Sequence, residues 1–140
     1  MTSAQETNAQ TIMVVDDDLM VRRLLERFLT SAGYQVVVAA SGFGLSGKVR
    51  ETQPALLLLD VNMPGLRGDA ALSILQQLGQ RFNSLDVPVV FHSGMGTAEL
   101  DRLARTHGAA GFLRKPAGRE QLLELVESVL DQSGAQLAVQ

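Results

Sequence analysis

The sequence contains no cysteine and no tryptophan, and only 4% of its 140 residues are aromatic. Without cysteine the chain has no disulfide framework and no thiolate metal ligand, so cysteine usage gives no information about the compartment. No apolar run approaches the ~18 residues of a membrane span. No GxxxxGK[ST] stretch occurs either, which disfavours an enzyme that uses nucleoside triphosphates.

Positive charge is also scarce, with Lys+Arg 12 against Asp+Glu 15 and a formal net charge of −3. A dedicated nucleic-acid-binding protein is usually basic, so nucleic acid is not an expected partner. Because no apolar run is long enough, a membrane is not an expected partner either. Residues 1–10 carry no positive charge and no apolar stretch, and so do not resemble a secretory signal. We therefore expect a soluble cytoplasmic protein.

The composition favours one packed domain. Apolar residues make up 46% of the chain and charged residues 19%, so a core can form and disorder is not expected. A length of 140 residues is close to the usual size of one domain. We expect a folded domain over residues 11–131, with a flexible N-terminal tail at 1–10 and a flexible C-terminal tail at 132–140.

Strand and helix patterns alternate five times along the chain. Short apolar, β-rich runs occupy 11–15, 35–40, 56–59, 88–92 and 111–114. Apolar residues recur with helical spacing over 19–32, 41–53, 69–78, 97–107 and 119–130. Strands that are buried on both faces give unbroken apolar runs such as VVVA and LLLL. The alternation predicts a doubly wound α/β fold with a five-stranded parallel sheet and five helices.

Particular residues mark the expected helix ends. Gly33 and Gly108 follow helical stretches where a residue with positive φ often ends a helix. Thr97 is a candidate N-cap. Gly44 and Gly47 fall inside the segment 41–53, and each costs about 1 kcal/mol relative to Ala in a helix interior. That helix is therefore the weakest of the five by pattern.

Acidic side chains follow two of the predicted strands. Asp16, Asp17 and Asp18 come directly after the first strand, and Asp60 comes directly after the third. The first and third strands of a doubly wound sheet are commonly neighbours, and ligands bind beyond the carboxyl ends of such strands. Carboxylates held close together repel one another, and a hard divalent cation such as Mg²⁺ relieves the repulsion. The simpler alternative is helix capping, which suits Asp18 in particular.

The two remaining strand ends carry complementary chemistry. Ser93 follows the fourth strand and supplies a hydroxyl, and Lys115 follows the fifth and supplies an ammonium group. A divalent cation and a lysine can offset charge on phosphoryl oxygens, and a hydroxyl can donate to one of them. The four strand ends together predict a site for phosphoryl chemistry that lacks a P-loop.

These residues lie in four stretches, VVDDD, LLLLDVNMPG, FHSG and LRKP, and in this order they resemble the receiver domain of two-component response regulators. The resemblance extends from about Thr11 to Leu130 and is closest to single-domain, chemotaxis-regulator-like receivers. It implies a flavodoxin-like sheet with the strand order 2-1-3-4-5. It also implies a signalling module rather than an enzyme.

The resemblance assigns a role to each acidic residue. Asp60 would accept a phosphoryl group from a phosphohistidine on a sensor histidine kinase or a histidine phosphotransfer protein. Asp16 and Asp17 would hold Mg²⁺, with Asp60 and the backbone carbonyl of Asn62 completing the protein ligands.

The resemblance also implies a conformational switch. Ser93 would bond the phosphoryl group and Lys115 would pair with it. The peptide bond between Lys115 and Pro116 is expected to be cis, as it often is in related domains. Phe112, three residues before the lysine, would then move inward behind Ser93. This movement would repack the face formed by the helix at 97–107, the strand at 111–114 and the helix at 119–130. A downstream protein target would read that face, and the chain would be a monomer or a phosphorylation-dependent dimer.

Two other functions fit parts of the pattern. Asp16-x-Asp18 resembles the nucleophile motif of haloacid-dehalogenase-type phosphatases, in which Asp16 would carry the phosphoryl group. The same fold could alternatively serve as a binding module that is independent of phosphorylation. The two readings that use phosphoryl chemistry differ over which aspartate is modified.

Simple structural roles are expected for several other polar residues. His92 lies in a predicted buried strand, where a core histidine bonded to the backbone is a more common situation than a ligand. Arg22 and Arg23 are expected on a solvated helix face. Met95 lies two residues after Ser93, where its apolar side chain would hinder the water that removes the phosphoryl group.

Overall fold

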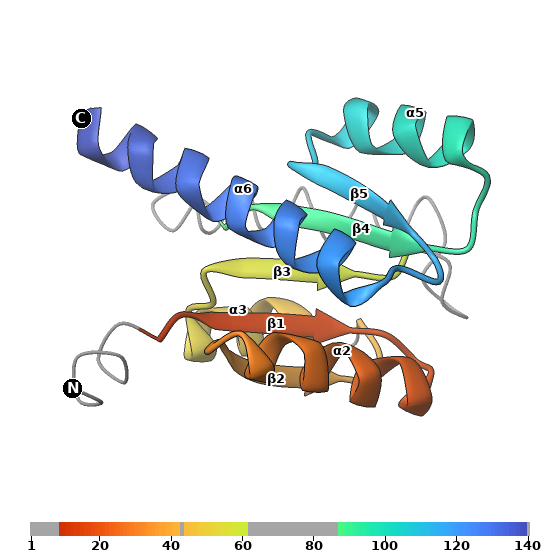
Figure 1. The fold of residues 1–140 in the computed structure, drawn as a ribbon, viewed down its shortest axis with the longest axis horizontal. Coiled ribbons are helices and arrows are strands. Elements are labelled where there is room, and N and C mark those ends of the chain that lie inside the picture. The colour runs from red at the N-terminus through yellow and green to blue at the C-terminus, as the bar shows by residue number, and fades with distance from the viewer. Residues whose placement is uncertain (1–8, 43, 62–86, 140) are drawn as a thin grey trace.

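The computed structural model describes residues 9–42, 44–61 and 87–139. In chain order the described elements are β1 (Thr11–Val15), α2 (Leu19–Ser31), β2 (Gln35–Ala39), α3 (Leu45–Thr52), β3 (Leu56–Leu59), β4 (Val89–Ser93), α5 (Thr97–His107), β5 (Gly111–Arg114) and α6 (Arg119–Val139). The strands form one parallel sheet with the order β2-β1-β3-β4-β5. The predicted α/β fold and strand order are therefore confirmed (Figure 1). The helix predicted over 69–78 lies outside the described residues.

The central strands are buried on both faces of the sheet. Every residue of β3 and β4 is buried, whereas the edge strand β2 is largely exposed. Leucine at all four positions of β3 is explained by this burial, because a central strand of a parallel sheet presents no face to water.

Among the described residues, two apolar cores flank the sheet. One contains residues of α3 and α5 together with side chains such as Val15, Leu59 and Phe91. The other contains residues of α2 and α6 together with side chains such as Val14 and Leu58. Helices α2 and α6 accordingly lie on the same side of the sheet (Figure 1). Consecutive residues of a strand, such as Val14 and Val15, belong to different cores because successive side chains point to opposite faces of the sheet.

A glycine with positive φ lies at the C-terminal end of two helices, as predicted. Gly33 follows α2 with φ of 97°, and Gly108 is the C-cap of α5 with φ of 73°. Both values are in the left-handed region that glycine adopts without a steric penalty.

Three predicted helix boundaries need correction. The helix predicted over 41–53 begins only at Leu45, because Gly44 takes φ of 69° and serves as its N-cap. Gly96 rather than Thr97 is the N-cap of α5, and Thr97 is the first helical residue. Helix α6 does not end at Leu130 but continues to Val139. The segment after Asp131 contains no proline, and a single glycine costs only about 1 kcal/mol in a helix.

Among the described helices, none combines the length and the apolar character that a membrane crossing needs.

Candidate functional site

The acidic residues meet at the carboxyl edge of the sheet because their strands are paired in register. Val15 of β1 is opposite Leu59 of β3, and Asp16 and Asp60 each come one residue later. The amide of Asp60 donates to the carbonyl of Val15 at 2.9 Å, which extends the pairing of the two strands to this point. The stiff buried strands therefore deliver both carboxylates to one place.

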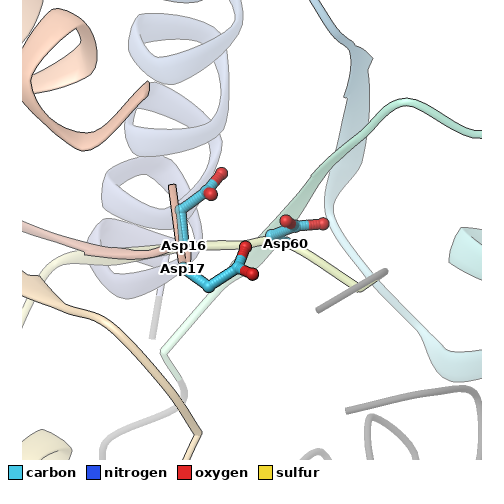
Figure 2. Close-up of side chains that lie close together, drawn as sticks. All are labelled: Asp16, Asp17 and Asp60. Atoms are coloured by element: carbon cyan, nitrogen blue, oxygen red, sulfur yellow. The ribbon is translucent and has the colours of Figure 1, made fainter. Parts of the chain in front are cut away.

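Asp16, Asp17 and Asp60 form a compact cluster, with one carboxylate oxygen of each within 4.8 Å of the others (Figure 2). Asp16 is 1% exposed and Asp60 is 4% exposed, whereas Asp17 faces solvent. The predicted convergence of the three side chains is confirmed. Two of the three carboxylates are thus buried, and the third faces water.

Lys115 bridges the two buried acids. Its Nζ lies 2.8 Å from Oδ2 of Asp16 and 3.0 Å from Oδ2 of Asp60. Burial by itself lowers the pKa of Lys115, but the hydrogen bonds and charges of Asp16 and Asp60 outweigh it, so the pKa is raised. The ammonium group is therefore charged at neutral pH and offsets part of the repulsion between the two carboxylates.

The turn between β1 and α2 is built around Asp16. Its Oδ1 accepts the backbone N–H of Asp18 at 2.9 Å, and its backbone carbonyl accepts Nη1 of Arg22 at 2.7 Å. Asp18 is the N-cap of α2 and accepts the N–H groups of Met20 and Val21. The capping alternative thus holds for Asp18, and not for Asp16.

Arg22 was expected on a solvated face, and this expectation is wrong. Helix α2 begins only four residues after β1 ends, so the side chain of Arg22 reaches back and its Nη1 donates to the carbonyl of Asp16. Arg23, the next residue, is exposed. No sequence pattern separates the two arginines, since helical periodicity assigns faces but not hydrogen bonds to a preceding loop.

Ser93 and Phe112 belong to the opposite side of the sheet. Ser93 is the last residue of β4 and is fully buried, and its Oγ accepts the backbone N–H of Met95 at 3.3 Å. Its carbonyl accepts the amide of Lys115 at 2.8 Å, which joins the fourth and fifth strand ends. Phe112 is partly buried against the same core as Met95. Ser93 is therefore joined to the site through the backbone of Lys115.

His92, which was expected to have only a structural role in the core, is a buried neighbour of the site. It is 3% exposed, and its Nδ1 lies 3.9 Å from Oδ2 of Asp16. Burial and the charge of Lys115 lower the pKa of His92 to about 4, although Asp16 acts in the opposite direction. The expected bond to the backbone is not present, because neither ring nitrogen has a hydrogen-bond partner among the described residues. A signal was available, since the two-residue repeat places His92 on the face of the sheet that carries Asp16.

Two further expectations concern the loops. The peptide bond between Lys115 and Pro116 is cis, as the resemblance implied. Asn62, the expected source of a carbonyl ligand, lies outside the described residues.

The cluster fits a divalent cation. Three carboxylates lie within reach of one ion, and the charge of Lys115 neutralises only one of them. Oxygen donors of this kind suit Mg²⁺, which keeps several of its waters and binds to one or two carboxylates. The exposed position of Asp17 leaves the site accessible to a hydrated ion.

Comparison with known proteins identifies the family. The sequence matches the response regulator receiver domain family over residues 12–127. The chain belongs to this family. Receivers are signalling modules rather than catalysts, so the phosphatase alternative has no support from the family match.

Two curated relatives differ in how much of their length the match covers. The probable transcriptional regulator ycf27 of Pyropia yezoensis is 34% identical over 126 residues, which make up 89% of this receiver and 49% of the relative. Protein PilG of Pseudomonas aeruginosa is 28% identical over 124 residues, which make up 89% of this receiver and 90% of PilG. The chain thus spans about half the length of the ycf27 relative.

Solved receivers have the same architecture. The signal receiver domain of a response regulator from Bermanella marisrubri is 32% identical, with a TM-score of 0.76 and coverage of 88% of this chain and 99% of that one. The chemotaxis protein CheY4 of Vibrio cholerae is 25% identical, with a TM-score of 0.76 and coverage of 86% and 98%. This receiver therefore has the CheY-like form of the flavodoxin fold.

Proposed function

We propose that this receiver accepts a phosphoryl group on Asp60 from a phosphohistidine of a sensor histidine kinase or a histidine phosphotransfer protein. The observation that carries the proposal is the position of Asp60. It is buried at the end of the central strand β3, is paired with Lys115 at 3.0 Å, and shares a cluster with Asp16 and Asp17. Asp16 has the same neighbours, but Asp60 directly follows β3, the middle strand of the sheet.

The transfer is a displacement at phosphorus. A carboxylate oxygen of Asp60 attacks the phosphorus, the new P–O bond forms, and the P–N bond to the donor imidazole breaks. The freed imidazole nitrogen takes up a proton from solvent. The product is an acyl phosphate, and its hydrolysis later restores the carboxylate. Lys115 turns from the carboxylates toward a phosphoryl oxygen and offsets its charge.

Mg²⁺ is the proposed cofactor, held by Asp16, Asp17 and Asp60, with the Asn62 carbonyl as a further ligand. When bound, it supplies charge neutralisation for the phosphoryl oxygens and for the attacking carboxylate. Asp16 is fixed for this role by two hydrogen bonds, from the Asp18 amide to its Oδ1 and from the Arg22 side chain to its backbone carbonyl. Exposed Asp17 completes the set on the solvent side.

We propose that the signal leaves through the face formed by α5, β5 and α6. A phosphoryl group adds nearly two negative charges and strong acceptor oxygens, which draw the hydroxyl of Ser93 toward Asp60. Ser93 is bonded to Met95 on one side and to Lys115 on the other, so its movement shifts both loops. Phe112 packs in the same core as Met95 and moves into the space that is released. A downstream protein then reads the repacked surface, with the receiver as a monomer or as a phosphorylation-dependent dimer.

The phosphorylated residue is the decisive test. The parent chain and the variants Asp60→Asn and Asp16→Asn are incubated with labelled acetyl phosphate and Mg²⁺. We expect label on the parent that is lost on treatment with hydroxylamine, as an acyl phosphate is, and no label on Asp60→Asn. Label retained by Asp60→Asn and lost in Asp16→Asn would instead favour the phosphatase reading. A parent chain without label, and with unchanged spectra at saturating beryllofluoride, would favour a binding module that is independent of phosphorylation.

A further inference from the structure

His92 is a buried polar side chain to which the proposed reaction gives no role. It is 3% exposed, and both ring nitrogens lack a hydrogen-bond partner among the described residues. Buried polar groups are nearly always hydrogen-bonded, and an exception calls for an explanation. One explanation is a partner that becomes available only in another state of the site.

The position of His92 identifies that partner. Val15, Leu59 and Phe91 are paired across β1, β3 and β4, and one residue further along come Asp16, Asp60 and His92. His92 therefore extends the row of the two buried acids. Its Nδ1 lies 3.9 Å from Oδ2 of Asp16, which is about 1 Å longer than an ordinary hydrogen bond.

The same oxygen of Asp16 is already occupied in this state. Nζ of Lys115 lies 2.8 Å from this oxygen and Nδ1 of His92 lies 3.9 Å from it. Both side chains therefore point to the same atom, and Lys115 is the one in contact with it. Phosphorylation of Asp60 would turn the ammonium of Lys115 toward the phosphoryl group. Oδ2 of Asp16 is buried and has no hydrogen-bond donor besides its ion pair with Lys115, so losing that ion pair would be costly at the moment when Asp16 must stay in place.

We propose that His92 is a positioning residue that donates a hydrogen bond to Oδ2 of Asp16 when Asp60 is phosphorylated, in place of the ion pair with Lys115. The imidazole is neutral and donates from Nδ1, so it holds the carboxylate without adding a charge that would compete with a cation. A movement of about 1 Å closes the distance. This inference rests on the proposed function, because Lys115 leaves Asp16 only if Asp60 receives the phosphoryl group.

Two variants of similar shape separate donation from packing. In His92→Asn the side-chain amide can replace Nδ1–H as a donor, and in His92→Leu a branched apolar side chain cannot. The initial rate of phosphorylation is measured at saturating acetyl phosphate and Mg²⁺. We expect His92→Leu to be about tenfold slower than the parent, as for the loss of one hydrogen bond to a charged group. We expect His92→Asn to stay within about threefold of the parent.

The affinity for Mg²⁺ without a phosphoryl donor is the control measurement. Lys115 still covers Asp16 in that state, so both variants should bind Mg²⁺ within about threefold of the parent. A phosphorylation rate of His92→Leu equal to that of the parent overturns the role. An equal loss in both variants also overturns it, because packing rather than donation would then be responsible.

A spectroscopic measurement on the parent chain does not depend on the variants folding. The imidazole of His92 is labelled with ¹⁵N and observed while Mg²⁺ and beryllofluoride are added. We expect the Nδ1 resonance to move to the position of a protonated, hydrogen-bonded nitrogen, with slowed hydrogen exchange. Unchanged imidazole resonances, in a chain whose other signals show that beryllofluoride is bound, overturn the role of His92 alone. A parent chain that binds no beryllofluoride and takes up no label overturns the proposed function itself.

Discussion

Nζ of Lys115 lies 3.0 Å from Oδ2 of Asp60, so the residue proposed to receive the phosphoryl group is already paired with a cation. The pair joins the end of β5 to the end of β3, with β4 between them. Because the same ammonium group also contacts Asp16, any ligand that draws Lys115 toward Asp60 changes the charge balance of the whole cluster. Several measurable properties of the site depend on this single lysine.

Replacing Lys115 with Met should strengthen Mg²⁺ binding. Unit charges about 4 Å apart interact by about 4 kcal/mol at an effective dielectric constant of 20. The side chain of Lys115 is 23% exposed, which screens part of this repulsion toward an incoming cation. We therefore expect a gain in affinity of about tenfold, measured by titration with Mg²⁺ in the absence of a phosphoryl donor. Lys48, which is exposed, is the matched control, and Lys48→Met should leave the affinity unchanged. Equal affinities of all three chains would contradict the bridging role of Lys115.

His92 should make the apo protein less stable at mildly acidic pH. Its pKa is lowered to about 4 in the folded chain, while the ordinary value of 6.5 applies to the unfolded chain. Between these values the unfolded state binds more protons, so stability falls as the pH decreases through this window. This effect of His92 lowers the free energy of unfolding by about 2 kcal/mol at pH 5 relative to pH 7.5.

Urea unfolding in EDTA at pH 7.5 and pH 5 measures this effect. The parent and His92→Asn share all carboxylates, including Asp16, so the difference between their losses of stability isolates the histidine. We expect the parent to lose more stability than the variant over this interval. Identical losses would show that the imidazole is not buried in its neutral form.

Arg22 and Arg23 should differ in their contribution to stability although they are adjacent. Arg22 is half-buried and donates to the carbonyl of Asp16 at 2.7 Å, whereas Arg23 is exposed. Arg22→Ala should lower the free energy of unfolding by about 1 kcal/mol, as for one hydrogen bond. Arg23→Ala should change it by less than about 0.5 kcal/mol. Thermal or urea unfolding of the two variants decides the matter, and equal effects would place both arginines on the solvated face.

The elements that could be predicted from the sequence are those with strong periodicity. The runs at 11–15 and 56–59 coincide with β1 and β3, because a strand buried on both faces tolerates few polar residues. The meeting of Asp16 with Asp60 followed from the topology of doubly wound sheets, and the full strand order was implied by the resemblance to receiver domains. These features depend on patterns that are local or common to the whole fold class.

Other features depend on tertiary contacts that no local pattern carries. The bond from Arg22 to Asp16 and the missing partners of His92 require knowledge of which side chains share a buried space. The start of α3 at Leu45 depends on the left-handed conformation of Gly44, and glycine is compatible with several conformations at that position. The extension of α6 to Val139 could not be predicted because the last residues lack an apolar stripe.

Met95 should prolong the life of the phosphoryl group. Its amide donates to Oγ of Ser93, and its partly buried side chain packs with the core that contains Phe91. An apolar chain at this position hinders the approach of water to the phosphoryl group beside Ser93, and a polar chain would hold that water by a hydrogen bond. We expect Met95→Glu and Met95→Gln to shorten the half-life of phosphorylated receiver several-fold, and Met95→Leu to leave it nearly unchanged. The half-life is followed after acetyl phosphate is removed in excess Mg²⁺, and the same value for Met, Leu, Gln and Glu would show that this side chain does not control access of water.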